Sequence, residues 1–246
     1  MSPERVELSQ DMLLAALGDG WSPSDVNAAA ELLSGGEGQF PSGIRSLPSD
    51  LVSAVQRERL LAAMLRATAQ LGYREVSVQD VLERAGVSRP TFYEHFENKE
   101  DCFLAAFDAA FDEAMRRIEA DCAKVEGGWE ERVQAGLAAF LGYVAEQPAL
   151  ARMCMIEALS ATPAATERYE DALQRFVDLT KQNVPHDDQL PETIEETLVG
   201  GVAWIVYQQI RRHEADKAED LLPELSEFML APFHGAAEAA QKRAST

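Results

Sequence analysis

The sequence is poor in cysteine, and this shortage excludes a disulfide-bonded framework. Its three cysteines, Cys102, Cys122 and Cys154, are odd in number and widely spaced, and no CxxC pair suggests zinc or a dithiol. We expect a reduced, cytoplasmic protein. None of the three has a basic cluster nearby to favour a thiolate, so we interpret them as buried structural residues rather than redox sensors.

Long apolar runs are also missing. The longest charge-free stretch of note, residues 197–210, is shorter than the roughly 20 residues of a membrane-spanning helix. The N-terminus lacks a basic region followed by an apolar run, as a secretion signal would have. We therefore expect neither export nor a membrane partner.

The sequence lacks the motifs of common enzymes. Its four histidines, His95, His186, His213 and His234, are scattered, and none is spaced i, i+4 from another histidine or a cysteine as a zinc site would require. We find no phosphate-binding loop, G-x-S-x-G motif or dinucleotide fingerprint. We expect no metal, no cofactor and no enzymatic activity.

Basic residues are few, with 22 Lys and Arg against 42 Asp and Glu, and the net charge is −20. Such a balance argues at first against a nucleic-acid partner, because phosphates repel an acidic surface. The charge is unevenly distributed, however. Residues 50–100 carry seven basic and eight acidic side chains, a net of −1, so −19 lies elsewhere. If residues 50–100 bind DNA, the strongly acidic remainder of the chain would suppress indiscriminate binding.

What the sequence does contain points to helices. Hydrophobic residues make up 46% and charged residues 26%, Ala, Leu, Glu and Arg recur throughout, and long strand-like runs of Val, Ile and Thr are absent. Apolar residues recur at helical spacing in one segment after another. The sequence predicts an all-α fold, with a smaller N-terminal three-helix domain and a larger C-terminal helical bundle.

Composition divides the chain into three parts. Residues 1–48 form an N-terminal extension, with two short helical candidates before residue 34 and a Gly/Pro/Ser-rich linker from 34 onward. Residues 49–97 form a first predicted helical domain, and residues 98–246 form a second, larger one. The extension is interpreted as a helix pair packed on the 49–97 domain, a flexible arm or a partner-binding element.

Helices are expected over the following segments: 49–71, 78–85, 89–96, from 98 through Phe111, 129–146, from 148 or 149 through Leu159, 163–182, 191–213 and 221–240 with a bend at Pro232. A polar loop covers 184–191.

The segment 78–96 has the pattern of a helix-turn-helix. Ser77 caps its first helix, the tight turn contains Gly86, and Ser88 caps the second helix with Pro90 in its first turn. A short turn with glycine lets the second helix leave at a steep angle and enter a major groove.

Phe92 and Phe96 are four residues apart and are predicted to point together into the core. Residues 89–91, Tyr93 and Glu94 are then left at the tip or on the outer side of the helix. Arg, Thr and Tyr side chains on that side offer a guanidinium, a hydroxyl and a ring edge to bases and phosphates.

The run 86–100, GVSRPTFYEHFENKE, resembles the signature of the TetR family of transcription regulators. In that signature GVS, a T-(L/F)-Y core, a following aromatic residue and NK(E/D) recur, and 71–73 and 77–81 match as well. The resemblance covers roughly residues 57–107, and the C-terminal half is similar only in the number and order of its helices. It implies that residues 49–97 are a helix-turn-helix DNA-binding domain and residues 98–246 a ligand-binding and dimerisation domain. The chain departs from the pattern at Leu82, where helix-turn-helix proteins often have alanine, and this bulk affects the expected angle between the two helices.

The resemblance implies which residues contact DNA. Arg89, Pro90 and Thr91 would approach base edges, with Gln79 reaching in from the preceding helix. For Arg89 a phosphate contact is an equal alternative to base reading.

Four further positions match phosphate-binding positions of the family. Tyr93, His95 and Ser77 would bind phosphates, and Lys99 would add its charge and the N–H groups that open the fourth helix. Packing or surface exposure without DNA contact is the alternative for Tyr93 and His95, and an ordinary solvated lysine is the alternative for Lys99.

The resemblance also implies a homodimer formed by helices 191–213 and 221–240, which would meet their copies as a four-helix bundle. Gly200 and Gly201 suit a close approach of helices, although packing within one subunit is the alternative. Two-fold symmetry would place the reading helices one DNA turn apart on a pseudo-palindromic site, a spacing of roughly 34–36 Å.

Methionine and aromatic residues of the C-terminal half are candidates for an effector pocket: Phe140, Tyr143, Met153, Ile156, Phe176, Trp204 and Tyr207. For each one taken alone, ordinary core packing is the simpler interpretation. Together they suggest a small, mostly apolar ligand.

These features predict a ligand-responsive DNA-binding transcriptional regulator, a repressor released from double-stranded operator DNA by an apolar effector. The alternative is a helical ligand-binding or protein-interaction module with a vestigial DNA head, which the acidic balance and the N-terminal extension motivate.

Overall fold

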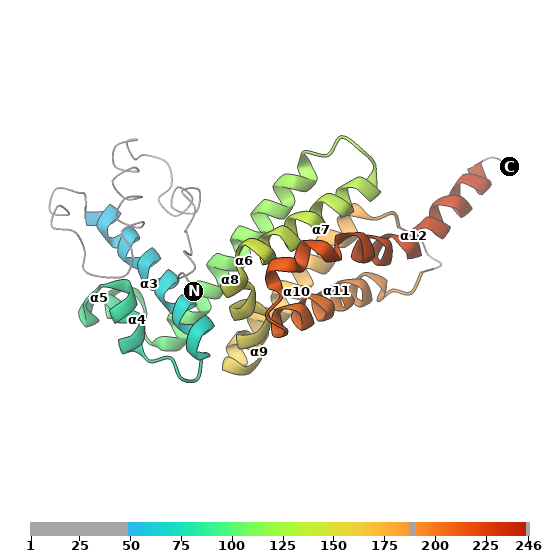
Figure 1. The fold of residues 1–246 in the computed structure, drawn as a ribbon. Helices are drawn as coiled ribbons and strands as arrows, with labels where there is room; N and C mark the ends of the chain where they lie inside the picture. The colour runs from blue at the N-terminus through green and yellow to red at the C-terminus, as the bar shows by residue number, and fades with distance from the viewer. Residues whose placement is uncertain (1–48, 187–189, 245–246) are drawn as a thin grey trace. The chain divides into compact units, whose positions relative to one another are not determined.

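A computed structural model describes residues 49–186 and 190–244 of the chain, with side chains up to residue 234 (Figure 1). Every element in these residues is helical, which confirms the predicted all-α class. The short helices and the linker predicted before residue 49 lie outside the described residues. Within the described part, no helix is both long and apolar enough to cross a membrane.

The described chain divides into two compact units, one ending at Ala109 and the other beginning at Ala110. This division falls inside helix α6 (Lys99–Ala123), which belongs to both units. The assignment of DNA binding to residues 49–97, and of ligand binding and dimerisation to 98–246, stays a prediction.

The first unit contains α3 (Ser49–Leu71), α4 (Val78–Ala85), α5 (Arg89–His95) and the start of α6. Glycines with positive φ end two of these helices, since Gly72 has φ 79° and follows α3, while Gly86 has φ 67° and follows α4. A side chain on the backbone disfavours this left-handed conformation, so glycine is the natural residue at both ends. The predicted bounds of the helix-turn-helix are confirmed to within one residue.

The core of the first unit is aromatic and aliphatic. Its largest fully buried side chains come from all four helices: Leu51, Val55, Leu60, Met64, Val81, Phe92 and Phe103. Polar side chains are buried with them, and one of these is Arg59, whose guanidinium donates from Nε to the Ala85 carbonyl at 2.7 Å. This bond fixes the end of α4 against α3.

The second unit contains the rest of α6 and a series of further helices: α7 (Trp129–Glu146), α8 (Pro148–Arg152), η2 (Met153–Glu157), α9 (Ala158–Ala161), α10 (Pro163–Asn183), α11 (Ile194–Arg211), η3 (Ala215–Leu221) and α12 (Leu222–Ala244). Their shared core includes Leu141 of α7, Val206 of α11, Ala218 of η3 and Phe233 of α12.

Two elements of this unit differ from the sequence prediction. The helix expected from Pro191 begins at Ile194, because the Pro191 carbonyl accepts the Ile194 N–H in a separate turn and Thr193 has a non-helical ψ of 15°. The segment Ala215–Leu221 forms a 3₁₀ helix that no periodic pattern had indicated.

The segment from α8 to α9 is continuous but contains one wider turn. Met153–Glu157 is π-helical, and the Ala158 N–H donates to the Met153 carbonyl five residues back. Such a turn holds one more residue than an α-helical turn. It brings Arg152 within 3.3 Å of the Glu157 carboxylate, a pair that is five positions apart.

Candidate nucleic-acid interface

Helix α5 is anchored by two phenylalanines. Phe92 is fully buried and Phe96 is 3% exposed, with their ring centroids 5.7 Å apart. On the opposite side Arg89 and Glu94 are exposed and Tyr93 is 51% exposed. The predicted orientation of the helix is confirmed. It presents a guanidinium and a phenol ring to the surroundings.

The start of α5 is held by its own cap. Ser88 Oγ accepts the Thr91 N–H at 3.3 Å, and the Ser88 and Thr91 hydroxyls lie 2.8 Å apart. Pro90 is exposed in the first turn, where its missing N–H leaves no bond unmade. Thr91 is half-buried, so its hydroxyl would contact a base only by sharing its bond to Ser88.

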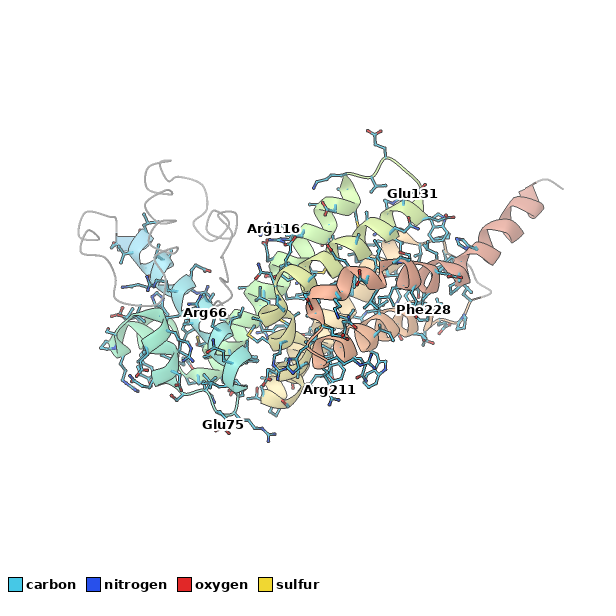
Figure 2. The ribbon with its side chains drawn as sticks, viewed as in Figure 1. Arg66, Glu75, Arg116, Glu131, Arg211 and Phe228 are labelled. Atoms are coloured by element: carbon cyan, nitrogen blue, oxygen red, sulfur yellow. The ribbon has the colours of Figure 1, made fainter. Side chains whose placement is uncertain are left out.

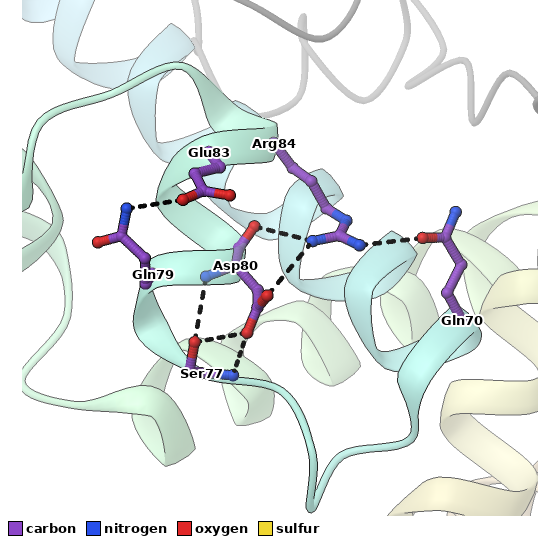
Figure 3. A network of polar contacts seen from close by, with 6 residues as sticks. All are labelled: Gln70, Ser77, Gln79, Asp80, Glu83 and Arg84. Carbon is purple, nitrogen blue, oxygen red and sulfur yellow. Dashed lines mark hydrogen bonds and ion pairs between the residues drawn. The ribbon is translucent and has the colours of Figure 1, made fainter.

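Ser77 begins α4 with a reciprocal cap, drawn in Figure 3. Its Oγ accepts the Asp80 N–H at 3.2 Å, and its own N–H donates to Asp80 Oδ2 at 2.8 Å. The Ser77 hydroxyl also donates to this carboxylate, and hydrogen bonds from Ser77 lower the pKa of Asp80. A phosphate contact by Ser77 would therefore compete with the cap.

Arg84 links this cap to α3. Its Nη1 donates to the Asp80 carbonyl at 3.1 Å and lies 4.0 Å from Asp80 Oδ1, while Nη2 donates to Gln70 Oε1 at 3.0 Å (Figure 3). Asp80 and Arg84 have the i, i+4 spacing of a helical ion pair, a signal that could have identified the pair from sequence. Gln70 is distant in sequence and carried no such signal.

Two of the predicted base-contacting residues lie together. Arg89 Nη2 donates to Gln79 Oε1 at 3.3 Å, across the turn between α4 and α5. The other end of the Gln79 amide donates to Glu83 Oε1 at 2.9 Å. Glu83 was not among the predicted site residues.

Lys99 is engaged within the first unit. Its Nζ donates to the carbonyls of Tyr73 and Val76, and burial is the main cause that lowers its pKa. The ammonium therefore fixes the loop before α4, and its predicted phosphate contact would use its remaining N–H.

His95 is only partly accessible. Its Nε2 is buried without a hydrogen-bond partner, and burial, with the nearby charge of Arg57, lowers the pKa of the imidazole. A phosphate contact by His95 would therefore use the other ring nitrogen, Nδ1.

The effector candidates divide into two groups. Phe140 and Phe176 meet at a centroid distance of 5.4 Å, and Phe176 also meets Phe111 edge to face at 5.5 Å. Phe111 was not predicted as a member of this group, because its periodicity marked it only as a core residue of α6. Met153 is fully buried in the same unit, and Ile156 packs against its core.

Tyr143 is buried and its hydroxyl donates to the Ala110 carbonyl at 3.1 Å, so its polar atom is already satisfied. Trp204 and Tyr207 do not join the phenylalanines. They stack on each other at 5.5 Å on α11, and Trp204 is 58% exposed. An exposed tryptophan does not line a closed pocket within one subunit.

The two adjacent glycines of α11 have different surroundings. A Cβ on Gly201 would lie 2.8 Å from Cζ of Phe228 on α12, whereas a Cβ on Gly200 would meet no atom within 4 Å. Figure 2 labels Phe228 beside α11. Gly201 therefore serves packing within one subunit, and Gly200 leaves an open place on an exposed surface that also includes Trp204 and Ile205.

Cys102 and Cys122 are buried, as predicted, and burial raises the pKa of both thiols. Cys154 is half-buried in the π-helical turn. Among the described residues no three His, Cys, Asp or Glu side chains are grouped so that they could hold a metal ion.

The capped helix α4, the glycine turn and the outward-facing helix α5 together define a helix-turn-helix protein. More particularly, residues 60–106 match the model of the tetR family of bacterial regulatory proteins. The predicted resemblance is confirmed over these residues, which are similar to the DNA-binding domain of that family.

A curated relative is the HTH-type transcriptional regulator EthR of Mycolicibacterium smegmatis, which is 30% identical over 128 residues. The match covers 49% of this chain and 55% of the relative, so the chain spans about half the length of the curated relative.

Two solved structures share the fold over most of the chain. One is the fatty acid degradation regulator FadR from Bacillus halodurans, with a TM-score of 0.64 and 16% identity over 71% of this chain and 94% of that one. The other is FadR from Bacillus subtilis in complex with stearoyl-CoA, with a TM-score of 0.63 and 17% identity over 70% and 96%. At these identities the likeness shows the fold alone.

Proposed function

We propose that the chain is a repressor that binds a pseudo-palindromic operator as a homodimer and is released by a small, mostly apolar effector. The observation that carries this proposal is the geometry of α5. Buried Phe92 and Phe96 fix the helix, so that Arg89 and Tyr93 project from its exposed side. Side chains of this kind on a helix-turn-helix read bases and hold phosphates.

The exposed apolar surface of α11 and α12 supports the dimer. Trp204 is 58% exposed, Phe228 42% and Ile205 39%, and Gly200, one turn before Trp204 on α11, leaves room for a helix to approach. Large exposed apolar side chains gathered in this way mark an interaction surface. A two-fold pair of copies would bury them and present two α5 helices to one duplex.

The phenylalanine group of Phe111, Phe140 and Phe176 supports an apolar effector, which would bind in the second unit. Because the B. subtilis FadR structure is in complex with stearoyl-CoA, a long-chain acyl-CoA is the first effector to test. Release requires that the ligand prefers a subunit arrangement in which the two α5 helices no longer match consecutive grooves.

The DNA-binding part is tested by incubating the full chain with a pool of genomic fragments over a series of salt concentrations. We expect retention of a small set of related sequences and a steep loss of binding as salt rises. The matched control is Arg89→Ala with Tyr93→Ala, which removes two exposed side chains of α5 while leaving Phe92 in place. Retention of no sequence by the wild-type chain would contradict the proposal and favour the ligand-binding module with a vestigial DNA head.

The effector part is tested by titrating stearoyl-CoA, and free coenzyme A as its polar control, into the DNA-bound protein. We expect stearoyl-CoA to lower operator affinity and coenzyme A to leave it unchanged. Binding of stearoyl-CoA with unchanged operator affinity would contradict the release mechanism. Tighter operator binding would instead identify an activator or a co-repressed regulator.

A further inference from the structure

Three exposed side chains form a hydrogen-bonded chain across the turn of the helix-turn-helix. Glu83 Oε1 accepts from Gln79 Nε2 at 2.9 Å, and Gln79 Oε1 accepts from Arg89 Nη2 at 3.3 Å. Glu83 and Gln79 are one turn apart on α4 (Figure 3), whereas Arg89 opens α5. The chain thus joins the outer sides of both helices.

The chemistry of the two ends allows only one orientation of the amide between them. An ionised carboxylate can only accept hydrogen bonds, and a guanidinium can only donate them. The nitrogen of Gln79 must therefore face Glu83, and its oxygen must face Arg89. Glu83 in this way fixes the acceptor that holds the Arg89 guanidinium.

This arrangement bears on which base each residue can read. A glutamine reads adenine by offering an N–H and its oxygen at once. In Gln79 one N–H is bonded to Glu83 and one lone pair of the oxygen to Arg89, so these two bonds, and not a base, set the orientation of the amide. An arginine has five N–H donors, of which the bond to Gln79 uses one. Arg89 keeps enough donors for a bidentate pair with O6 and N7 of guanine, the most common specific contact in a major groove.

We propose, resting on the DNA-binding function proposed above, that Arg89 reads a guanine in each half-site and that Glu83 is a positioning residue acting on it through Gln79. Gln79 supports Arg89 in this assignment and does not read adenine. Glu83 never contacts the base, and its negative charge opposes DNA binding in general while its oxygen improves discrimination at one position.

The experiment is a selection of bound duplexes from a random-sequence library with the full-length chain and its variants. For the wild type we expect a guanine at one position of each half-site. Arg89→Ala should reduce that preference by about 5- to 150-fold, the range of one good bidentate pair, and leave the other positions unchanged. Glu83→Ala and Gln79→Ala should reduce it at the same position by about 3- to 10-fold, the scale of one lost hydrogen bond.

Two variants separate the hydrogen bond from the charge. Glu83→Gln keeps an oxygen acceptor for the Gln79 amide and should retain most of the guanine preference. Glu97→Ala removes the same charge from an exposed position outside the chain of bonds and should retain all of it. Both alanine variants, at 83 and at 97, should bind mixed-sequence DNA at least as tightly as the wild type, because each loses a negative charge.

Three results would overturn parts of this proposal. Wild-type preference in Glu83→Ala, or a loss in Glu83→Gln as large as in Glu83→Ala, would overturn the positioning role. A selected site whose guanine preference survives in Arg89→Ala would overturn the assignment of the base and leave the DNA-binding function intact. Selection of no sequence by the wild type would overturn the proposed function and this inference together.

Discussion

The Nζ of Lys99 lies 4.2 Å from the centroid of the Tyr73 ring and donates hydrogen bonds to the carbonyls of Tyr73 and Val76 at 3.0 and 2.8 Å. One ammonium therefore joins the first turn of α6 to the loop between α3 and α4. The family resemblance gives this lysine a role toward DNA, and the structure gives it a role in the fold.

Replacing Lys99 by methionine should lower the free energy of unfolding by about 1–3 kcal/mol, because two partly buried carbonyls lose their donor. Denaturant unfolding of the full chain measures this. Lys124→Met is the control, since Lys124 has a single ion pair with Asp121 and its side chain is 74% exposed; such pairs contribute at most about 1 kcal/mol. Equal effects of the two substitutions would argue against the structural role.

Ser77→Ala should lower the free energy of unfolding by about 1 kcal/mol, the usual value of a helix N-cap. The change removes the hydroxyl that accepts the Asp80 N–H. Ser53→Ala makes the same substitution at an exposed place inside α3, where alanine is the better helix former, so its stability should stay equal or rise. A cap role would be contradicted if both variants behaved alike in thermal unfolding.

Glu58→Gln should stabilise the chain at neutral pH and not at acid pH. Burial, partly offset by the charge of Arg57, raises the pKa of Glu58 above its usual 4.5. Between the pKa of Glu58 in the unfolded chain and its higher pKa in the folded chain, the folded chain holds a proton that the unfolded chain has released. The free energy of unfolding therefore falls as pH rises through that range.

The gain from Glu58→Gln should be on the order of 1 kcal/mol at pH 7, the scale of burying a poorly paired charge, and should vanish below the unfolded pKa. Unfolding by denaturant at several pH values measures it. Glu126→Gln, at an exposed position between α6 and α7, should change stability by less than about 0.5 kcal/mol at every pH. A Glu58→Gln effect that does not vary with pH would rule out this origin.

His213→Gly should raise the free energy of unfolding by about 0.5–1 kcal/mol. His213 has φ 59° after the end of α11, a left-handed conformation in which a Cβ is crowded. His213→Ala keeps the Cβ and should leave the melting temperature close to that of the wild type. If alanine stabilised as much as glycine, the backbone conformation would not be the cause.

Trp204→Ser should weaken the proposed dimer by about 30-fold or more, since buried aromatic anchors at interfaces contribute 2 kcal/mol or more. Sedimentation equilibrium measures the dissociation constant. Leu159→Ser is the matched control, because Leu159 is an exposed apolar residue of α9, outside α11 and α12. An unchanged dimer in Trp204→Ser, or a loss of similar size in Leu159→Ser, would place the interface elsewhere.

Local signals explain why the helix-turn-helix could be predicted so closely from sequence. A serine before α4, a glycine after it and a proline in the first turn of α5 act within a few residues of their own position. Such short-range rules do not depend on the rest of the fold.

Partners from distant parts of the chain could not be predicted in the same way. The carbonyls that Lys99 contacts are 23 and 26 residues away, and Arg84 finds Gln70 on another helix. Trp204 illustrates the same limit, because helical spacing shows that it shares a face with Tyr207 but not whether that face is covered. Only the packing of α11 against its neighbours decides this.

The two adjacent glycines of α11 differ in what a side chain at each position would contact. Successive positions on a helix are turned by about 100°, so residues 200 and 201 look in different directions. The Cβ of an alanine at 201 would clash with the ring of Phe228 in every folded subunit. The Cβ of an alanine at 200 would clash with nothing in its own subunit, and only a second molecule on that surface could contact it. A sequence alignment that treats Gly-Gly as one motif would therefore combine a requirement of folding at 201 with a requirement of the proposed dimer at 200.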